Sequence, residues 1–215
     1  AIFRVGVRKV VAVEDGLRRL RGEADRLMGL IEDILDLTRL ESGKLALKTV
    51  PIAINEIAHA AVETTKASAN KHGVTLVEEL SEDLPLLRLD EVKMRQVVVN
   101  LVVNAIKFGG EGGQVVVHTA REPKYVRVEV RDRGPGIAPE ATTHIFELFG
   151  QAAPEDTGRE SGAGIGLHLV KRISELHGGH VGVNSIPGEG SIFWVRLPLA
   201  LAETAEQASR ERAAA

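Results

Sequence analysis

The chain has 215 residues, of which 44% are hydrophobic and 3% aromatic, enough for one globular domain with an appended segment. Its formal net charge of -3 argues against a nucleic-acid partner, because there is no overall basic field to attract phosphates. The absence of cysteine excludes disulfides, cysteine metal sites and a thiol nucleophile. No run of about eighteen uncharged apolar residues occurs, so we expect a cytoplasmic chain that reaches a membrane only through parts outside it.

The first predicted element is a long helix that ends near residues 40–43. Apolar or small residues recur there at alternating spacings of three and four: Val10, Val13, Leu17, Leu20, Ala24, Leu27, Ile31 and Ile34. This is the seam of a coiled coil or helical bundle, and further leucines around it widen the apolar face. We therefore expect residues 1–50 to be a dimerisation helix that forms a homodimer, with a simple packing helix as the alternative.

From residue 51 the pattern becomes a compact α/β mixture. Helices are predicted at 55–71, 90–107 and 166–176, and strands at 74–79, 86–89, 114–119, 125–130, 180–184 and 191–197. Most of these strands are joined by hairpins rather than by crossover helices. The predicted fold is therefore an α/β (α+β) two-layer sandwich over residues 51–199, with a mixed, largely antiparallel sheet and its helices on one face. Residues 200–215 are expected to be a tail or linker.

A polar stripe interrupts the predicted helix at 90–107. Asn100, Asn104 and Lys107 in the stretch NLVVNAIKF are spaced four and three apart, so their side chains share one face of the helix. A helix that is otherwise apolar is expected to hold a polar ligand on such a stripe.

Two glycine-rich segments indicate the class of ligand. In DRGPGI, Asp132 can only accept hydrogen bonds, which suits an exocyclic amino group such as that of adenine, while Gly134 and Gly136 allow backbone to approach a flat ring. In GAGIGL, Gly162, Gly164 and Gly166 open a helix, where N–H groups and the helix dipole favour phosphate. An ordinary turn and an ordinary helix start are the alternatives.

Two other phosphate motifs are excluded. The dinucleotide fingerprint requires a glycine where Leu167 stands, and a strand directly before the motif, whereas a long loop precedes it here. The P-loop requires Gly-Lys-Ser/Thr, a triplet that occurs nowhere in the chain.

In this order, the motifs resemble the catalytic ATP-binding domain of sensor histidine kinases, in the ATPase superfamily shared with gyrase and the heat-shock chaperones. NLVVNAIKF is similar to the N box, DRGPGI to the G1 box, IFELF at 145–149 to the F box, GAGIGL to the G2 box and GEGSIF at 188–193 to the final glycine turn. The preceding IEDILDLTRLESGKL is similar to the second helix of the family's dimerisation domain.

The resemblance implies a site for Mg²⁺ and ATP. Asn104 would be the Mg²⁺ ligand, Asn100 and Lys107 would hold the triphosphate, and Asp132 would bind adenine. The polar loop GQAAPEDTGRES at 150–161 looks like the ATP lid, with Arg159 on the terminal phosphate. The full implied nucleotide set is Asn100, Asn104, Lys107, Asp132, Gly134, Gly136, Ile137, Phe149, Gly162, Gly164, Ile165, Gly166 and Leu167.

The residue at position 100 bears on the reaction type. Hydrolysing members of the superfamily carry a glutamate general base four residues before the metal-binding asparagine, whereas Asn100 cannot act as a base. The resemblance thus implies transfer of the γ-phosphoryl group to histidine, served by Asn100, Lys107 and Arg159, and onward to an aspartate of a response regulator. Anti-sigma serine kinases, which carry the glutamate, are the weaker alternative.

The family's phosphoacceptor motif, a histidine followed by an acidic residue, is absent from the sequence. Two interpretations remain open. The chain is a fragment that begins after the helix bearing the acceptor, or it is a pseudokinase that binds ATP as a regulatory scaffold.

Overall fold

The computed structural model describes residues 46–110, 112–150 and 164–202, together with scattered positions between 16 and 40. The chain divides into two compact units, Ala1–Leu45 and Ala46–Ala215. The described positions of the first unit are helical. Five of the predicted seam residues are among them and have exposed side chains, namely Leu20, Ala24, Leu27, Ile31 and Ile34. The first unit therefore exposes apolar surface along the seam that the sequence predicted.

The second unit contains a five-stranded sheet with the strand order β2-β4-β5-β7-β6. The strands are β2 (Thr75–Leu80), β4 (Gln114–Arg121), β5 (Tyr125–Asp132), β6 (His180–Ile186) and β7 (Gly190–Pro198). β2 pairs with β4 in parallel, and the other three pairings are antiparallel. The predicted mixed, largely antiparallel sheet is confirmed.

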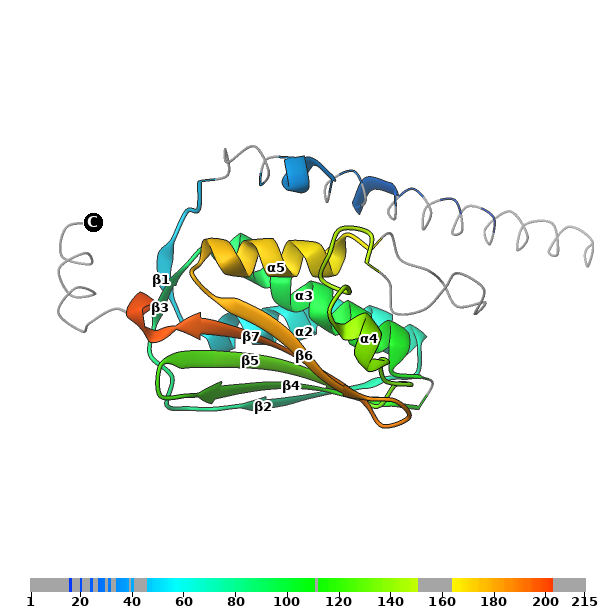
Figure 1. The fold of residues 1–215 in the computed structure, drawn as a ribbon. Coiled ribbons are helices and arrows are strands. Elements are labelled where there is room, and N and C mark those ends of the chain that lie inside the picture. The colour runs from blue at the N-terminus through cyan, green and yellow to red at the C-terminus, as the bar shows by residue number, and fades with distance from the viewer. Residues whose placement is uncertain are drawn as a thin grey trace, which may run out of the picture. The chain divides into compact units, whose positions relative to one another are not determined.

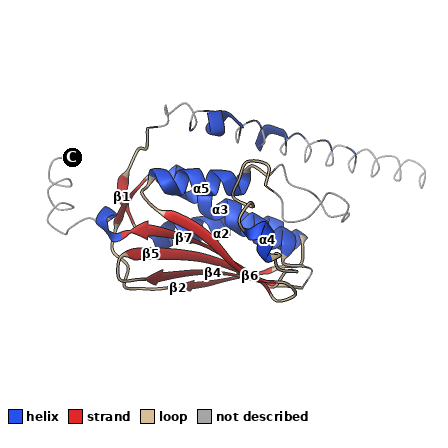
Figure 2. Ribbon diagram, viewed as in Figure 1, coloured by secondary structure: helices blue, strands red, loops and turns tan. Residues whose placement is uncertain are grey.

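Three helices cover one face of the sheet: α2 (Ile54–Lys71), α3 (Glu91–Phe108) and α5 (Gly166–Leu176) (Figure 1). Alternate strand residues such as Val128 and Val130 face these helices and are fully buried, because successive side chains of a strand point to opposite faces. Helix residues such as Leu101 and Ile173 complete the core. Figure 2 shows the resulting two layers, as the sequence predicted.

Three short elements were not predicted: β1 (Val50–Ile52), α4 (Pro139–Thr142) and a 3₁₀ helix (Leu199–Leu201). β1 pairs with β3 (Leu87–Leu89), the strand predicted at 86–89, in a separate antiparallel sheet, and α4 and the 3₁₀ helix are single turns. Asp90, predicted as the first residue of a helix, is the N-cap of α3, and its side chain accepts a hydrogen bond from the Lys93 N–H at 3.1 Å. Among the described residues, none of the helices has both the length and the apolarity needed to cross a membrane.

Candidate functional site

The predicted polar stripe lies on α3. Asn100, Asn104 and Lys107 are half-buried, whereas Leu101 and Ala105, on the adjoining face of the helix, are buried in the core. The Lys107 ammonium lies 5.2 Å from the centroid of the Phe108 ring, within the range of a cation–π contact. The stripe therefore borders the core and presents two amides and a cation along one side of the helix.

The N box and the G2 box meet in the structure. The Asn100 side-chain nitrogen donates to the Gly166 carbonyl oxygen at 3.4 Å, and a Cβ on Gly166 would lie 3.6 Å from the Asn100 amide carbon. Gly166 is the first residue of α5, and the N-cap residue Ile165 has no side-chain group that could cap the helix. The N–H groups of the first turn precede the first intrahelical bond, from Leu169 to Ile165, and are suited to bind an anion.

Asp132 ends β5 as a buried carboxylate, with 8% of its surface exposed. Its Oδ1 accepts a hydrogen bond from the Gly134 N–H at 2.8 Å. Burial raises the pKa of Asp132, and hydrogen bonds from the backbone of Gly134 and Ser191 partly oppose this shift. The carboxylate is held in place by the protein, as a fixed acceptor for a ligand requires.

The glycines of the G1 box lie where the backbone of neighbouring segments leaves no room for a side chain. A Cβ on Gly134 would lie 2.5 Å from the Phe108 carbonyl oxygen, which places the G1 turn against the end of α3. Gly136 has φ +69°, and its Cβ would lie 2.1 Å from the Ile186 carbonyl oxygen. The Ile137 N–H donates to the Ser185 hydroxyl at 2.8 Å. These glycines are therefore required by contacts within the protein, a reason that the sequence did not reveal.

The last residue of the F box, Phe149, contacts Gly164 of the G2 box. Phe149 has φ +62°, an uncommon conformation for a non-glycine residue, and its N–H donates to the Gly164 carbonyl oxygen at 3.1 Å. A Cβ on Gly164 would lie 2.7 Å from the Phe149 Cα, so only glycine fits there. Residues 149 and 164, on either side of the predicted lid, are thus brought close together. Arg159 and Gly162 lie outside the described residues, and Leu167 is half-buried in the first turn of α5.

Sequence reasoning missed one structurally important histidine, His177. His177, at the C-cap of α5, is only 3% exposed, and its Nε2 accepts a hydrogen bond from the N-cap residue of α3, Asp90. The only sequence sign was its position immediately before Gly178, which has φ +69°.

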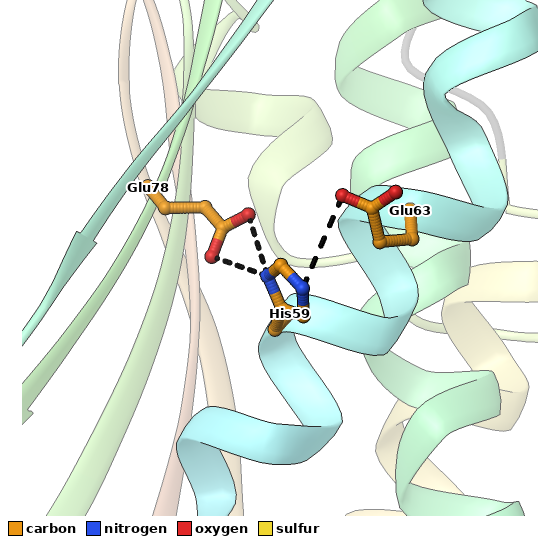
Figure 3. Close-up of side chains that lie close together, drawn as sticks. All are labelled: His59, Glu63 and Glu78. Carbon is orange, nitrogen blue, oxygen red and sulfur yellow. Dashed lines mark hydrogen bonds and ion pairs between the residues drawn. The ribbon is translucent and has the colours of Figure 1, made fainter.

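A separate cluster joins α2 to the inner side of β2 (Figure 3). His59 Nδ1 lies 3.1 Å from both carboxylate oxygens of Glu78, and His59 Nε2 lies 4.0 Å from Glu63. Glu63 is also paired with Lys66, which lowers the pKa of Glu63 through a side-chain hydrogen bond. His59 and Glu63 are exposed, so we interpret the cluster as a surface link between the helix and the edge strand.

Comparison with known proteins identifies the family. Residues 89–201, more than half of the chain, match the model of the histidine kinase-, DNA gyrase B-, and HSP90-like ATPase family. The chain belongs to this family. The match runs from the last residue of β3 to the end of the 3₁₀ helix and includes all five of the quoted motifs.

Relatives within the family are sensor kinases. The sensor protein GacS of Pseudomonas syringae pv. syringae is 35% identical over 190 residues, which are 86% of this chain and 21% of GacS. The alginate biosynthesis sensor protein KinB of Pseudomonas aeruginosa is 34% identical over 185 residues, 86% of this chain and 30% of KinB. The chain thus spans between about a fifth and a third of the length of these relatives.

A solved structure agrees with this assignment. Full-length ShkA in complex with AMPPNP is similar to this chain with a TM-score of 0.75 and 35% identity, covering 86% of this chain and 38% of ShkA. The second unit is accordingly the ATP-binding catalytic domain of a sensor histidine kinase, as the sequence resemblance implied.

Proposed function

We propose that this domain binds ATP with Mg²⁺ and donates the γ-phosphoryl group to a histidine that is not part of this chain. The observation that carries the proposal is the contact of Asn100 with Gly166, which unites the polar stripe of α3 with the first turn of α5. The buried Asp132 carboxylate ends β5 in the same unit and supplies the acceptor for an adenine amino group.

The residues present fit a magnesium nucleotide. Asn104 is half-buried on the same helix face as Asn100, and an amide oxygen is a hard ligand of the kind Mg²⁺ prefers. We propose Asn104 as the metal ligand, and Asn100 and Lys107 as groups that hold the phosphates. When bound, Mg²⁺ neutralises charge on the transferred phosphate. Arg159, in the predicted lid, is proposed to contact the terminal phosphate.

In the proposed reaction, an imidazole nitrogen of the acceptor attacks the γ-phosphorus. The bond to the β–γ bridging oxygen breaks, and ADP leaves with that oxygen. Asn100 has no basic group and cannot take a proton from water, which supports transfer to histidine rather than hydrolysis. Positioning and charge neutralisation by the protein are sufficient for this class of reaction.

The further partners follow from the sensor-kinase relatives and the first unit. We propose that the phosphoryl group passes from the acceptor histidine to a response regulator, and that the exposed seam of Leu20, Leu27, Ile31 and Ile34 pairs with a second copy. Burying these side chains between helices would remove apolar surface from water.

The transfer is tested by incubating the chain with Mg²⁺ and γ-labelled ATP, alone and with a dimerisation helix that carries a histidine. We expect acid-labile label on the added histidine only, and no label with the Asn104→Ala variant. Label on this chain or rapid release of inorganic phosphate would contradict the proposal. If nucleotide binds but no label is transferred, the scaffold interpretation is favoured.

A further inference from the structure

α3 and α5 run antiparallel beside each other and are attached near both ends of their shared length. At one end, Asn100 contacts Gly166. At the other, the Asp90 backbone N–H donates to His177 Nε2 at 3.0 Å. On α3, Asp90 lies ten residues before Asn100, and on α5, His177 lies eleven residues after Gly166. The two contacts are therefore about 15–17 Å apart along each helix. The two contacts together fix the register of one helix against the other.

The chemistry of the distant contact specifies the state of the histidine. His177 Nδ1 lies 2.9 Å from the Ile173 carbonyl oxygen, which can only accept, so Nδ1 carries the proton. Nε2 is then free of a proton and accepts the Asp90 N–H. Both ring nitrogens are satisfied only when the imidazole is neutral.

The same cap binds a third segment. The Asp90 carboxylate accepts a hydrogen bond from the Lys93 N–H in the first turn of α3, and another, at 2.8 Å, from the Lys48 N–H, which precedes β1. Asp90 thus joins the segment before β1, the start of α3 and the C-cap of α5, at the opposite end of α5 from the G2 box.

We propose that His177 is a positioning residue for nucleotide binding, which holds the first turn of α5 over Asn100 by pinning the far end of α5 to the cap of α3. This inference rests on the proposed function. The contact of Asn100 with Gly166 is long for a hydrogen bond, so on its own it constrains α5 weakly. Loss of the His177 contact leaves the buried Asp90 N–H without its acceptor and frees α5 to shift along α3.

The chain contains a matched control in His72. This residue is also a helix C-cap, its Nδ1 also lies close to the carbonyl oxygen four residues earlier, at 2.8 Å, and a glycine with positive φ also follows. His72 is exposed, however, and among the described residues its side chain makes no hydrogen bond to a second helix. A substitution at His72 therefore reports the local effect of losing a C-cap histidine, without the bridge.

The first experiment compares His177→Leu, His177→Gln and His72→Leu. Gln can present an oxygen acceptor near the position of Nε2, whereas Leu cannot. We expect His177→Leu to weaken AMPPNP binding about tenfold, as losing the acceptor of one buried donor predicts. His177→Gln should restore most of this affinity, and His72→Leu should leave it unchanged. A folded His177→Leu variant that binds AMPPNP with wild-type affinity would overturn the proposal.

Hydrogen exchange without nucleotide separates this proposal from the proposed function. Amides of Leu169 and Val170, the first of α5 that donate within the helix, should exchange about tenfold faster in His177→Leu and return towards wild-type rates in His177→Gln. Faster exchange confined to the neighbourhood of His177 would contradict a positioning role, even if the wild type binds no nucleotide at all.

An acid shift provides the test if His177→Leu does not fold. The elements that meet there carry several charged or titratable residues close in sequence to the contact: Lys48 before β1, Arg88 on β3, Asp90, Glu91 and Lys93 at the start of α3, Lys171, Arg172 and Glu175 on α5, and His180 and Arg196 beyond the Gly178–Gly179 turn. Of these, the Asp90 charge favours protonation of His177, against the stronger effect of burial. Lowering the pH from about 7.5 to about 5 should reduce the protection of the Leu169 and Val170 amides, measured against the intrinsic exchange rate at each pH, more in the wild type than in His177→Gln. An equal loss of protection in both proteins would contradict the proposal.

Discussion

The Asn100 side-chain nitrogen lies 3.4 Å from the Gly166 carbonyl oxygen, although 66 residues separate the two positions. This contact brings the polar stripe of α3 to the N-terminus of α5, where helix geometry favours a phosphate. A Cβ on Gly166 would lie at van der Waals distance, 3.6 Å, from the Asn100 amide carbon, so the two positions are in direct contact. The nucleotide site is thus built from two helices that lie side by side on the sheet.

Replacing the proposed metal ligand is expected to separate metal binding from folding. Asn104→Ala should reduce Mg²⁺-dependent nucleotide affinity by about tenfold or more, because a ligand to a charged group is lost. The free energy of unfolding should change little, since the Asn104 side chain is only half-buried. Val103→Ala, at an exposed neighbour on α3, is the control and should have little effect on either quantity. Calorimetry with and without Mg²⁺ measures the difference, and an unchanged affinity in Asn104→Ala would remove the metal assignment.

The Asp132 carboxylate is expected to select adenine. Asp132→Asn replaces a pure acceptor with an amide that also donates, so affinity for adenine nucleotides should fall about tenfold to a hundredfold. Affinity for guanine nucleotides should fall less, and the comparison of the two ligands is the control. A parallel loss for both bases would indicate that Asp132 does not contact the base.

The same substitution should not destabilise the fold. Because burial raises the pKa of Asp132, its contribution to stability is present at low pH and is lost as the pH rises through that pKa. The neutral Asn avoids this loss. At neutral pH, chemical denaturation of Asp132→Asn should therefore give a free energy of unfolding equal to or above that of the wild type.

Two glycines with positive φ provide a matched pair for backbone packing. Gly136 and Gly188 have φ +69° and +86°, but a Cβ on Gly136 would lie 2.1 Å from the Ile186 carbonyl oxygen, and nothing lies within 4 Å of one on Gly188. Gly188→Ala should cost about 1–2 kcal/mol from backbone conformation alone. Gly136→Ala should cost clearly more, because the G1 turn must also move away from β6. Thermal or chemical unfolding measures both losses. If the two variants lose the same free energy of unfolding, the close approach of Gly136 to Ile186 contributes nothing to the difference.

Stability is expected to fall on acidification through His177. Burial lowers the pKa of His177 below its ordinary value, so the unfolded chain binds a proton more readily than the folded one. The contribution is complete above the unfolded pKa of about 6.5 and is lost as the pH falls towards the folded pKa, at up to about 1.4 kcal/mol per pH unit. Denaturation of the wild type and of His177→Gln across this range measures the effect. Parallel curves for the two proteins would exclude His177 as the cause.

The long elements could be predicted from the sequence because their patterns are local. The apolar periodicity of α5 gave bounds of 166–176, which the structure matches, and the alternating valines of β4 and β5 identified the central hairpin. The three residues of β1 are too few to show a pattern, and their pairing with β3 depends on contacts between distant segments. The parallel pairing of β2 with β4 follows from the crossover through α3, which strand periodicity does not encode.

The residue types of the candidate site could be predicted from the sequence, but the backbone conformations and contacts that hold these residues in place could not. Their spacing predicted that Asn100 and Asn104 share one face of a helix, and the DRGPGI motif predicted a role for Asp132. The positive φ of Phe149 and the bridge from His177 to Asp90 could not be predicted, since they arise from backbone contacts between segments far apart in the chain. The glycines show the same limit, because Gly134 and Gly136 were interpreted as space for a ligand and are packed against protein backbone.

The central claim, that this domain is a magnesium-dependent ATP-binding donor, is tested most directly by calorimetric titration with a non-hydrolysable ATP analogue in the presence and absence of Mg²⁺. The account predicts saturable binding that is strengthened by Mg²⁺ and weakened in Asn104→Ala. At about millimolar ligand, the titration detects binding as weak as about 4 kcal/mol of free energy. If no binding is seen at that concentration, the claim is contradicted.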